Sequence, residues 1–100
     1  MIQKAVDSDP INGAYLDSLG WAYFKLNRVE MAELYLKRAI RFAPTNATLY
    51  DHLGDLYYKL ARYQEAANQW TKSLQFAEGD EADKVRKKLD QAKTKVANNR

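Results

Sequence analysis

The sequence repeats itself after 34 residues, and this period constrains the fold more than any other feature. Residues 16–23, Leu-Asp-Ser-Leu-Gly-Trp-Ala-Tyr, return as Tyr-Asp-His-Leu-Gly-Asp-Leu-Tyr at residues 50–57. Aligning residues 13–46 with residues 47–80 gives ten identities. A shared period of this length indicates a chain built from stacked copies of one small unit.

Each copy contains two apolar patterns of helical period, separated by a short turn. In the first copy, apolar residues at three- and four-residue spacing predict a helix from Gly13 to about Leu26. A second helix follows from Val29 and stops before Pro44, because proline cannot continue a helix. Asn46 is then expected to cap the next copy. The unit is therefore predicted to be a helical hairpin.

A glycine lies inside the first helix of each hairpin, at Gly20 and Gly54. A glycine inside a helix lowers the stability of that helix by about 1 kcal/mol relative to alanine. Because it occurs at the same place in both copies, we expect that close packing against a neighbouring helix requires it. An alanine follows twelve residues later in each copy, at Ala32 and Ala66. We expect the two helices of each hairpin to touch where both side chains are small.

The two ends of the chain differ from the repeats between them. Ile2, Ala5 and Val6 before Pro10 resemble the end of a preceding repeat. The last segment has only a narrow apolar stripe, which begins at Val85 and predicts a capping helix with a water-facing outer surface. The predicted division is the end of a truncated preceding repeat at 1–12, repeats at 13–46 and 47–80, a capping helix at 81–97 and a frayed tail at 98–100.

Composition excludes several classes of protein. The chain has no cysteine, which removes disulfides and thiolate chemistry, and no apolar run approaches the roughly 18 residues of a membrane helix. It also lacks the start of a signal peptide, so we expect a soluble protein, cytoplasmic or periplasmic. Residues 84–100 hold seven basic and one acidic side chain, so the basic balance belongs to the tail.

These residues resemble the tetratricopeptide repeat, a 34-residue helix-turn-helix unit. The signature of this unit is a large residue, two positions of any type, Leu-Gly, two more positions of any type and Tyr, followed later by Ala, a large residue and Pro. The first copy matches it at Leu16, Leu19, Gly20, Tyr23, Ala32, Leu36, Ala39 and Pro44. The second copy matches it at Tyr50, Leu53, Gly54, Tyr57, Tyr63, Ala66 and Trp70. Trp70, on the apolar stripe, is expected in the core. The resemblance is closest to segments of bacterial proteins. It implies an all-α fold, a right-handed superhelix of antiparallel hairpins with about five to six helices.

The resemblance also implies a concave groove, lined by the first helices, that binds peptides or partner helices. The groove residues predicted on this basis are Asp17, Trp21, Phe24, Lys25, Asp51, Asp55, Tyr58 and Lys59. Trp21 and Phe24 lie off the apolar stripe, where large aromatic side chains commonly anchor a partner, although packing on a neighbouring repeat would explain them too. The aspartates favour a protein or peptide ligand that is basic and aromatic rather than acidic.

One subclass of the family clamps the acidic tails of heat-shock chaperones with lysine and asparagine. Lys84 and Lys88 fall at two of the clamp positions if the last helix is shifted by two residues, but Asp17 and Asp51 oppose an acidic ligand. A chaperone-tail clamp is therefore disfavoured.

Catalysis and cofactors are not expected. Asp51 and Asp55 stand one turn apart beside His52, but a second histidine, a phosphate-binding loop and a nucleophile motif are all lacking. We therefore predict no enzyme, no metal and no cofactor.

Two alternatives to a binding groove remain open. One is a structural element that self-assembles through its repeat ends, with a homo-oligomer formed at the N-terminal face. The other is contact with anions, nucleic acid or lipid through the basic C-terminal helix, although nucleic acid is disfavoured because no aromatic residues are interleaved with the basic ones.

Overall fold

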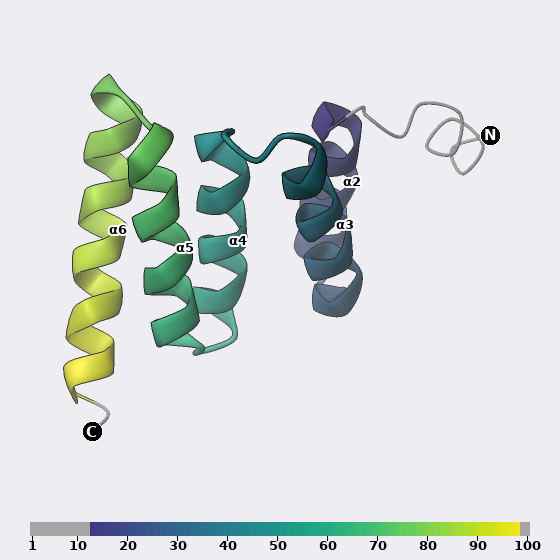
Figure 1. Ribbon diagram of the computed structural model, residues 1–100. Helices are drawn as coiled ribbons and strands as arrows, with labels where there is room; N and C mark the ends of the chain where they lie inside the picture. Colours follow the sequence, from purple (N-terminus) through teal and green to yellow (C-terminus); the bar gives the residue numbers. More distant parts are fainter. Residues whose placement is uncertain (1–12, 99–100) are drawn as a thin grey trace. The chain divides into compact units, whose positions relative to one another are not determined.

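The computed structural model describes residues 13–98, and this range is helical throughout apart from short turns (Figure 1). Its helices are α2 (Gly13–Lys25), α3 (Val29–Phe42), α4 (Ala47–Lys59), α5 (Tyr63–Phe76) and α6 (Gly79–Asn98). No strand occurs in residues 13–98, so the predicted all-α class is confirmed. The preceding repeat predicted from Ile2, Ala5 and Val6 lies outside the described residues.

The chain divides into two compact units, with the boundary between Thr45 and Asn46. Unit 1 contains the α2–α3 hairpin, and unit 2 contains α4, α5 and α6. Within unit 2, α5 packs against both α4 and α6.

The hairpin of unit 1 closes through a tight turn at the predicted position. Asn27 takes a left-handed conformation with φ of 61°, which asparagine tolerates well, and the Arg28 N–H donates to the Tyr23 carbonyl at 2.9 Å. The core-facing side of α3 buries Ala32, Leu36 and Ala39. Leu26 falls just beyond α2 and is 68% exposed, although its spacing placed it on the apolar stripe.

The glycines mark close helix contacts, and the nearest side chain in each hairpin is larger than the alanine that was predicted. A Cβ at Gly54 would lie 2.5 Å from Trp70 Nε1, so the indole ring occupies the space that a side chain would need. A Cβ at Gly20 would lie 3.0 Å from Leu36 Cγ and 3.3 Å from the Ala32 carbonyl oxygen. The expected approach of glycine to alanine is therefore met in part in the first hairpin, through the Ala32 backbone. It is wrong for Gly54, whose nearest neighbour is Trp70 rather than Ala66, and in each hairpin a large side chain lies closest to the glycine.

Unit 2 begins with the predicted cap. The Asn46 side chain accepts a hydrogen bond from the Thr48 N–H at 3.0 Å, which satisfies one of the free donors at the start of α4. The turn from α4 to α5 repeats that of unit 1, with Ala61 at φ of 61° in the place of asparagine. Ser73 is buried on α5, and its hydroxyl donates to the Ala47 carbonyl at 2.8 Å.

The final helix covers one side of unit 2 and presents the rest of its surface to water. Its buried residues lie on one stripe and are Ala82, Val85, Leu89 and Ala92. The Thr48 hydroxyl donates to Glu81 Oε2 at 2.8 Å, so a polar side-chain contact also joins α6 to α4.

Candidate functional site

Two of the predicted groove residues, Trp21 and Phe24, lie against each other on α2. Trp21 and Phe24 stand three positions apart on α2, and their rings stack with centroids 4.8 Å apart and planes inclined at 29°. Both side chains are half-buried, whereas the core position Leu16 on the same helix is fully buried. Asp17 lies one turn before Trp21 and is also half-buried, and Lys25 is exposed. On α2, the two stacked rings are therefore preceded by the carboxylate of Asp17 and followed by the ammonium group of Lys25.

The acidic pair predicted on the second hairpin holds an ammonium group from the same chain. Lys88 of α6 places its Nζ 3.0 Å from Asp51 Oδ1 and 3.0 Å from Asp55 Oδ1. Asp51 and Asp55 are one turn apart on α4, so both carboxylates reach one cation. The Lys88 side chain is 35% exposed, and the two aspartates are less exposed. The cluster therefore carries one more negative charge than positive.

Burial and the neighbouring charges together shift two pKa values in this cluster. Burial raises the pKa of the Asp55 carboxyl above its usual range, and the neighbouring Asp51 charge adds to the rise, although the hydrogen bond and charge of Lys88 oppose it. Burial by itself would lower the pKa of Lys88, but hydrogen bonds to both aspartates and their charges outweigh it, so this pKa is raised. Both groups therefore hold a proton more tightly than they would in water.

A buried tryptophan links this cluster to the core of unit 2. The Trp70 indole N–H donates to Asp51 Oδ1 at 2.9 Å and lies 3.2 Å from the Asp51 carbonyl oxygen. Lys88 Nζ lies 5.9 Å from the centroid of the Trp70 ring, within the range of a cation–π contact. Trp70 is buried, as the sequence predicted, and it also fixes the direction of the Asp51 carboxylate.

The remaining residues predicted on α4 differ in their surroundings. Tyr58 packs edge-on against Tyr63 at 5.0 Å and lies 5.7 Å from the Trp70 ring, so it belongs to an aromatic cluster with α5. Lys59 is exposed. The structure thus places Asp51 and Tyr58 against Trp70, and Asp55 is joined to Asp51 through Lys88.

Sequence reasoning missed the role of Lys88 as a partner of α4. From the sequence, Lys88 was expected only at a possible clamp position for an acidic chaperone tail, or on the water-facing surface of the last helix. The i, i+4 spacing of the two aspartates was a usable signal, because it creates a site for one cation, but the sequence does not say which lysine fills it.

Within residues 13–98 no three His, Cys, Asp or Glu side chains are grouped so as to hold a metal ion. In the same range no helix combines the length and the apolar character needed to cross a membrane.

Comparison with known families agrees with the repeat period. Models of the tetratricopeptide repeat match residues 13–46 and residues 46–78. No curated protein matches the chain significantly. The two matches span both helical hairpins, and this chain belongs to the tetratricopeptide repeat family.

Proposed function

We propose that this chain is a protein-interaction scaffold that binds a peptide or a partner helix on its first helices, α2 and α4. Tetratricopeptide repeats generally mediate contacts between proteins, and they are typically scaffolds rather than enzymes. The observation that carries the proposal for this chain is the stacked pair of Trp21 and Phe24, which lies off the buried stripe of α2. Large aromatic side chains in such positions are frequent anchors for a partner.

The ligand that fits best carries basic and apolar side chains. Asp17 adds a carboxylate one turn from Trp21 on α2. On α4, Asp51 and Asp55 already hold the ammonium group of Lys88, which supports a preference of this pair for cations. The excess negative charge of the cluster favours a further cationic group over an acidic one. Lys25, Tyr58 and Lys59 complete the proposed ligand contacts of the two helices.

A peptide screen with matched variants tests the proposal. The chain is exposed to arrayed peptides that differ only in having lysine or glutamate beside aromatic residues, and the best binder is titrated by fluorescence anisotropy. We expect basic peptides to bind, and Trp21→Ala or Phe24→Ala to weaken binding at least about tenfold, as expected for anchor residues. Phe76→Ala is the control, because Phe76 is a 39% exposed aromatic residue on α5, outside the proposed surface.

The result is decisive in either direction. Equal binding of acidic and basic peptides would refute the proposed ligand chemistry. Binding that persists in Trp21→Ala and Phe24→Ala but is lost in Phe76→Ala would refute the proposed surface.

A second candidate function, self-assembly, is favoured by the exposure of the first hairpin. Just beyond α2, Leu26 is 68% exposed, and Ala22 on α2 is also exposed. On α6, in contrast, apolar residues at the same three- and four-residue spacing are buried, namely Val85, Leu89 and Ala92. Sedimentation equilibrium from about 10 μM to 1 mM tests it, because a weak dimer changes mass over this range. A mass of one chain throughout, or a dimer unaffected by Leu26→Lys, would rule out assembly through this part of α2.

Anion binding by α6 stays a prediction. Of its basic side chains, Lys88 pairs with the aspartates of α4 and Arg86 pairs with Asp83 at 3.0 Å. A titration of nucleic acid or acidic liposomes at increasing salt would test the side chains that remain on its outer surface.

A further inference from the structure

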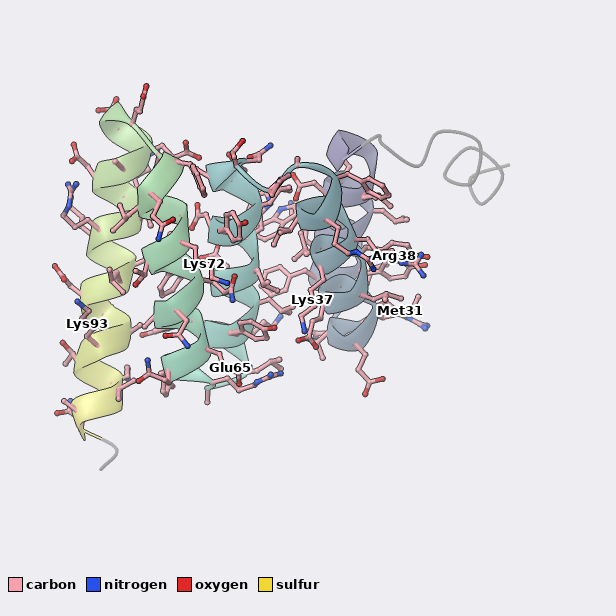
Figure 2. All side chains as sticks on the ribbon, viewed as in Figure 1. Met31, Lys37, Arg38, Glu65, Lys72 and Lys93 are labelled. Atoms are coloured by element: carbon pink, nitrogen blue, oxygen red, sulfur yellow. The ribbon has the colours of Figure 1, made fainter. Side chains whose placement is uncertain are left out.

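The helix α3 carries a row of large side chains on the face opposite its buried stripe. Leu34 and Phe42 are 41% and 43% exposed, although both are large and apolar. Arg38 lies between them at four-residue intervals and is exposed, as is the neighbouring Arg41. Met31 precedes Leu34 by three positions, and Figure 2 shows Met31 and Arg38 projecting from the same side of α3. We call these five residues the α3 outer face.

The second repeat shows that folding does not require this composition. The positions 34 residues later on α5 are Glu65, Asn68, Lys72, Gln75 and Phe76. Only the phenylalanine is retained, so its exposure is a property of the repeat. Met31 and Leu34 are apolar, whereas the equivalent residues of α5, Glu65 and Asn68, are polar. Because the hairpin folds with polar residues at these positions, the apolar side chains of α3 point to a contact outside the hairpin.

The charges on the α3 outer face are positive and directed outward. The Arg38 guanidinium lies 5.6 Å from the centroid of the Tyr35 ring, which restricts its orientation. Lys37, in contrast, is paired with Glu33 at 3.1 Å. Among the described residues, no carboxylate forms an ion pair with Arg38 or Arg41. Two guanidinium groups beside exposed apolar side chains are complementary to a surface that combines carboxylates with apolar residues.

We propose that the α3 outer face docks an acidic amphipathic helix of a partner protein. On α3, residues four apart are separated by about 6 Å along the axis, so Leu34, Arg38 and Phe42 alternate apolar, cationic and apolar at that interval. A partner helix has the same interval, so a row of apolar, acidic and apolar residues can match it. The glutamate or aspartate in the middle of that row accepts the two parallel hydrogen bonds that a guanidinium group offers.

A membrane surface fits the same face less well. α3 carries Glu30 and Glu33 as well as three basic residues, so its net charge is only +1. Stable attachment of a helix to an anionic bilayer usually needs a broad basic face and a wider apolar one.

The experiment uses the full chain and a designed peptide. The probe is a fluorescein-labelled helical peptide of about 18 residues, a length at which isolated helices become stable, with leucine and glutamate in i, i+4 rows. A second peptide carries lysine in place of each glutamate, and vesicles containing phosphatidylserine are the third probe. The variants are Leu34→Asn, which installs the residue found in α5, and Arg38→Glu; the matched control is Lys72→Glu at the equivalent exposed position of α5. Circular dichroism checks that each variant remains helical.

We expect the acidic peptide to bind in preference to the basic one. Leu34→Asn and Arg38→Glu should each weaken binding at least tenfold, about 1.4 kcal/mol, while Lys72→Glu leaves it unchanged. Trp21→Ala should also leave it unchanged, which separates this surface from the one proposed on α2. Equal binding of both peptides, no loss in the two α3 variants, or an effect of these variants on vesicle binding alone would overturn the proposal.

Discussion

The contact between Gly54 and Trp70 makes Gly54→Ala a sharp test of how the second hairpin is held together. A Cβ at this position would lie 2.5 Å from Trp70 Nε1 and 2.7 Å from two carbons of the ring. The ring cannot move away easily, because it is buried and its N–H is bonded to Asp51 at 2.9 Å. Ordinary contact would require the ring and the α4 backbone to separate by about 1 Å.

The expected loss follows from opposing effects. Overpacking of a filled core costs about 1 to 3 kcal/mol, and a strained Trp70 hydrogen bond adds up to about 1 kcal/mol. Replacing glycine by alanine inside a helix returns about 1 kcal/mol. We therefore expect Gly54→Ala to lower the free energy of unfolding by about 2 kcal/mol, which is roughly 10 °C in Tm for a domain of this size.

Gly20→Ala is the matched control on the first hairpin. Its Cβ would lie 3.0 Å or more from Leu36 and the Ala32 carbonyl oxygen, so a shift of a few tenths of an ångström suffices. The gain in helix propensity offsets that strain, and we expect a change within about 0.5 kcal/mol.

Urea denaturation followed by circular dichroism measures both variants. The double variant Gly54→Ala/Trp70→Leu reproduces the glycine-facing residue of the first hairpin, and it should cost less than the sum of its single changes. If Gly54→Ala is as stable as the parent, or if the double variant shows no coupling, the indole ring does not set the requirement for glycine.

Three further predictions concern the turn, the cap and the ion cluster of unit 2. Ala61→Gly should stabilise the chain by about 0.5 to 1 kcal/mol in urea denaturation, because Ala61 holds a left-handed conformation that costs alanine but not glycine; a loss of stability would contradict this reading. Asn46→Ala should cost about 1 kcal/mol while Asn46→Asp retains stability, since only the alanine variant loses the cap; equal stability of the two variants would argue against a capping role. The raised pKa of Lys88 means that its contribution to stability is complete below its ordinary pKa of about 10.4 and is lost as pH rises through the folded-state pKa. Above about pH 10 the parent should therefore lose stability more steeply than Lys88→Met, by about 0.5 kcal/mol because the side chain is partly exposed; parallel pH profiles would show that the pair with Asp51 and Asp55 adds nothing.

The repeat period was sufficient to predict the helices, because a hairpin of this family buries residues at fixed spacing. The turn between Leu26 and Val29 followed from the gap between two apolar patterns and the cap at Asn46 from its residue type, and the structure confirms both. The short turn predicted for the second copy is formed at Ala61, but its left-handed backbone was not predicted, since alanine carries no signal for that conformation.

The partners across helices could not be predicted with the same success. Gly54 was paired with Ala66 from their shared period, but the residue one turn further along α5, Trp70, is the one that covers it. Both residues lie on the face of α5 that meets α4, and periodicity cannot choose between them. Lys88 was missed for a related reason, because the register of α6 against α4 depends on packing that a single sequence does not reveal.

The side-chain bonds between α4 and α6 have a consequence for the order of folding. Thr48 bonds to Glu81 across 33 residues, and Lys88 bonds to Asp51 and Asp55 across 37 and 33 residues. These separations are close to one repeat length, so each bond closes a loop of moderate entropy and none requires a residue of unit 1. A chain that begins at Asn46 retains every one of them. Folding can therefore start in unit 2 and reach α2 and α3 afterwards, and the first hairpin becomes the part that opens earliest under stress.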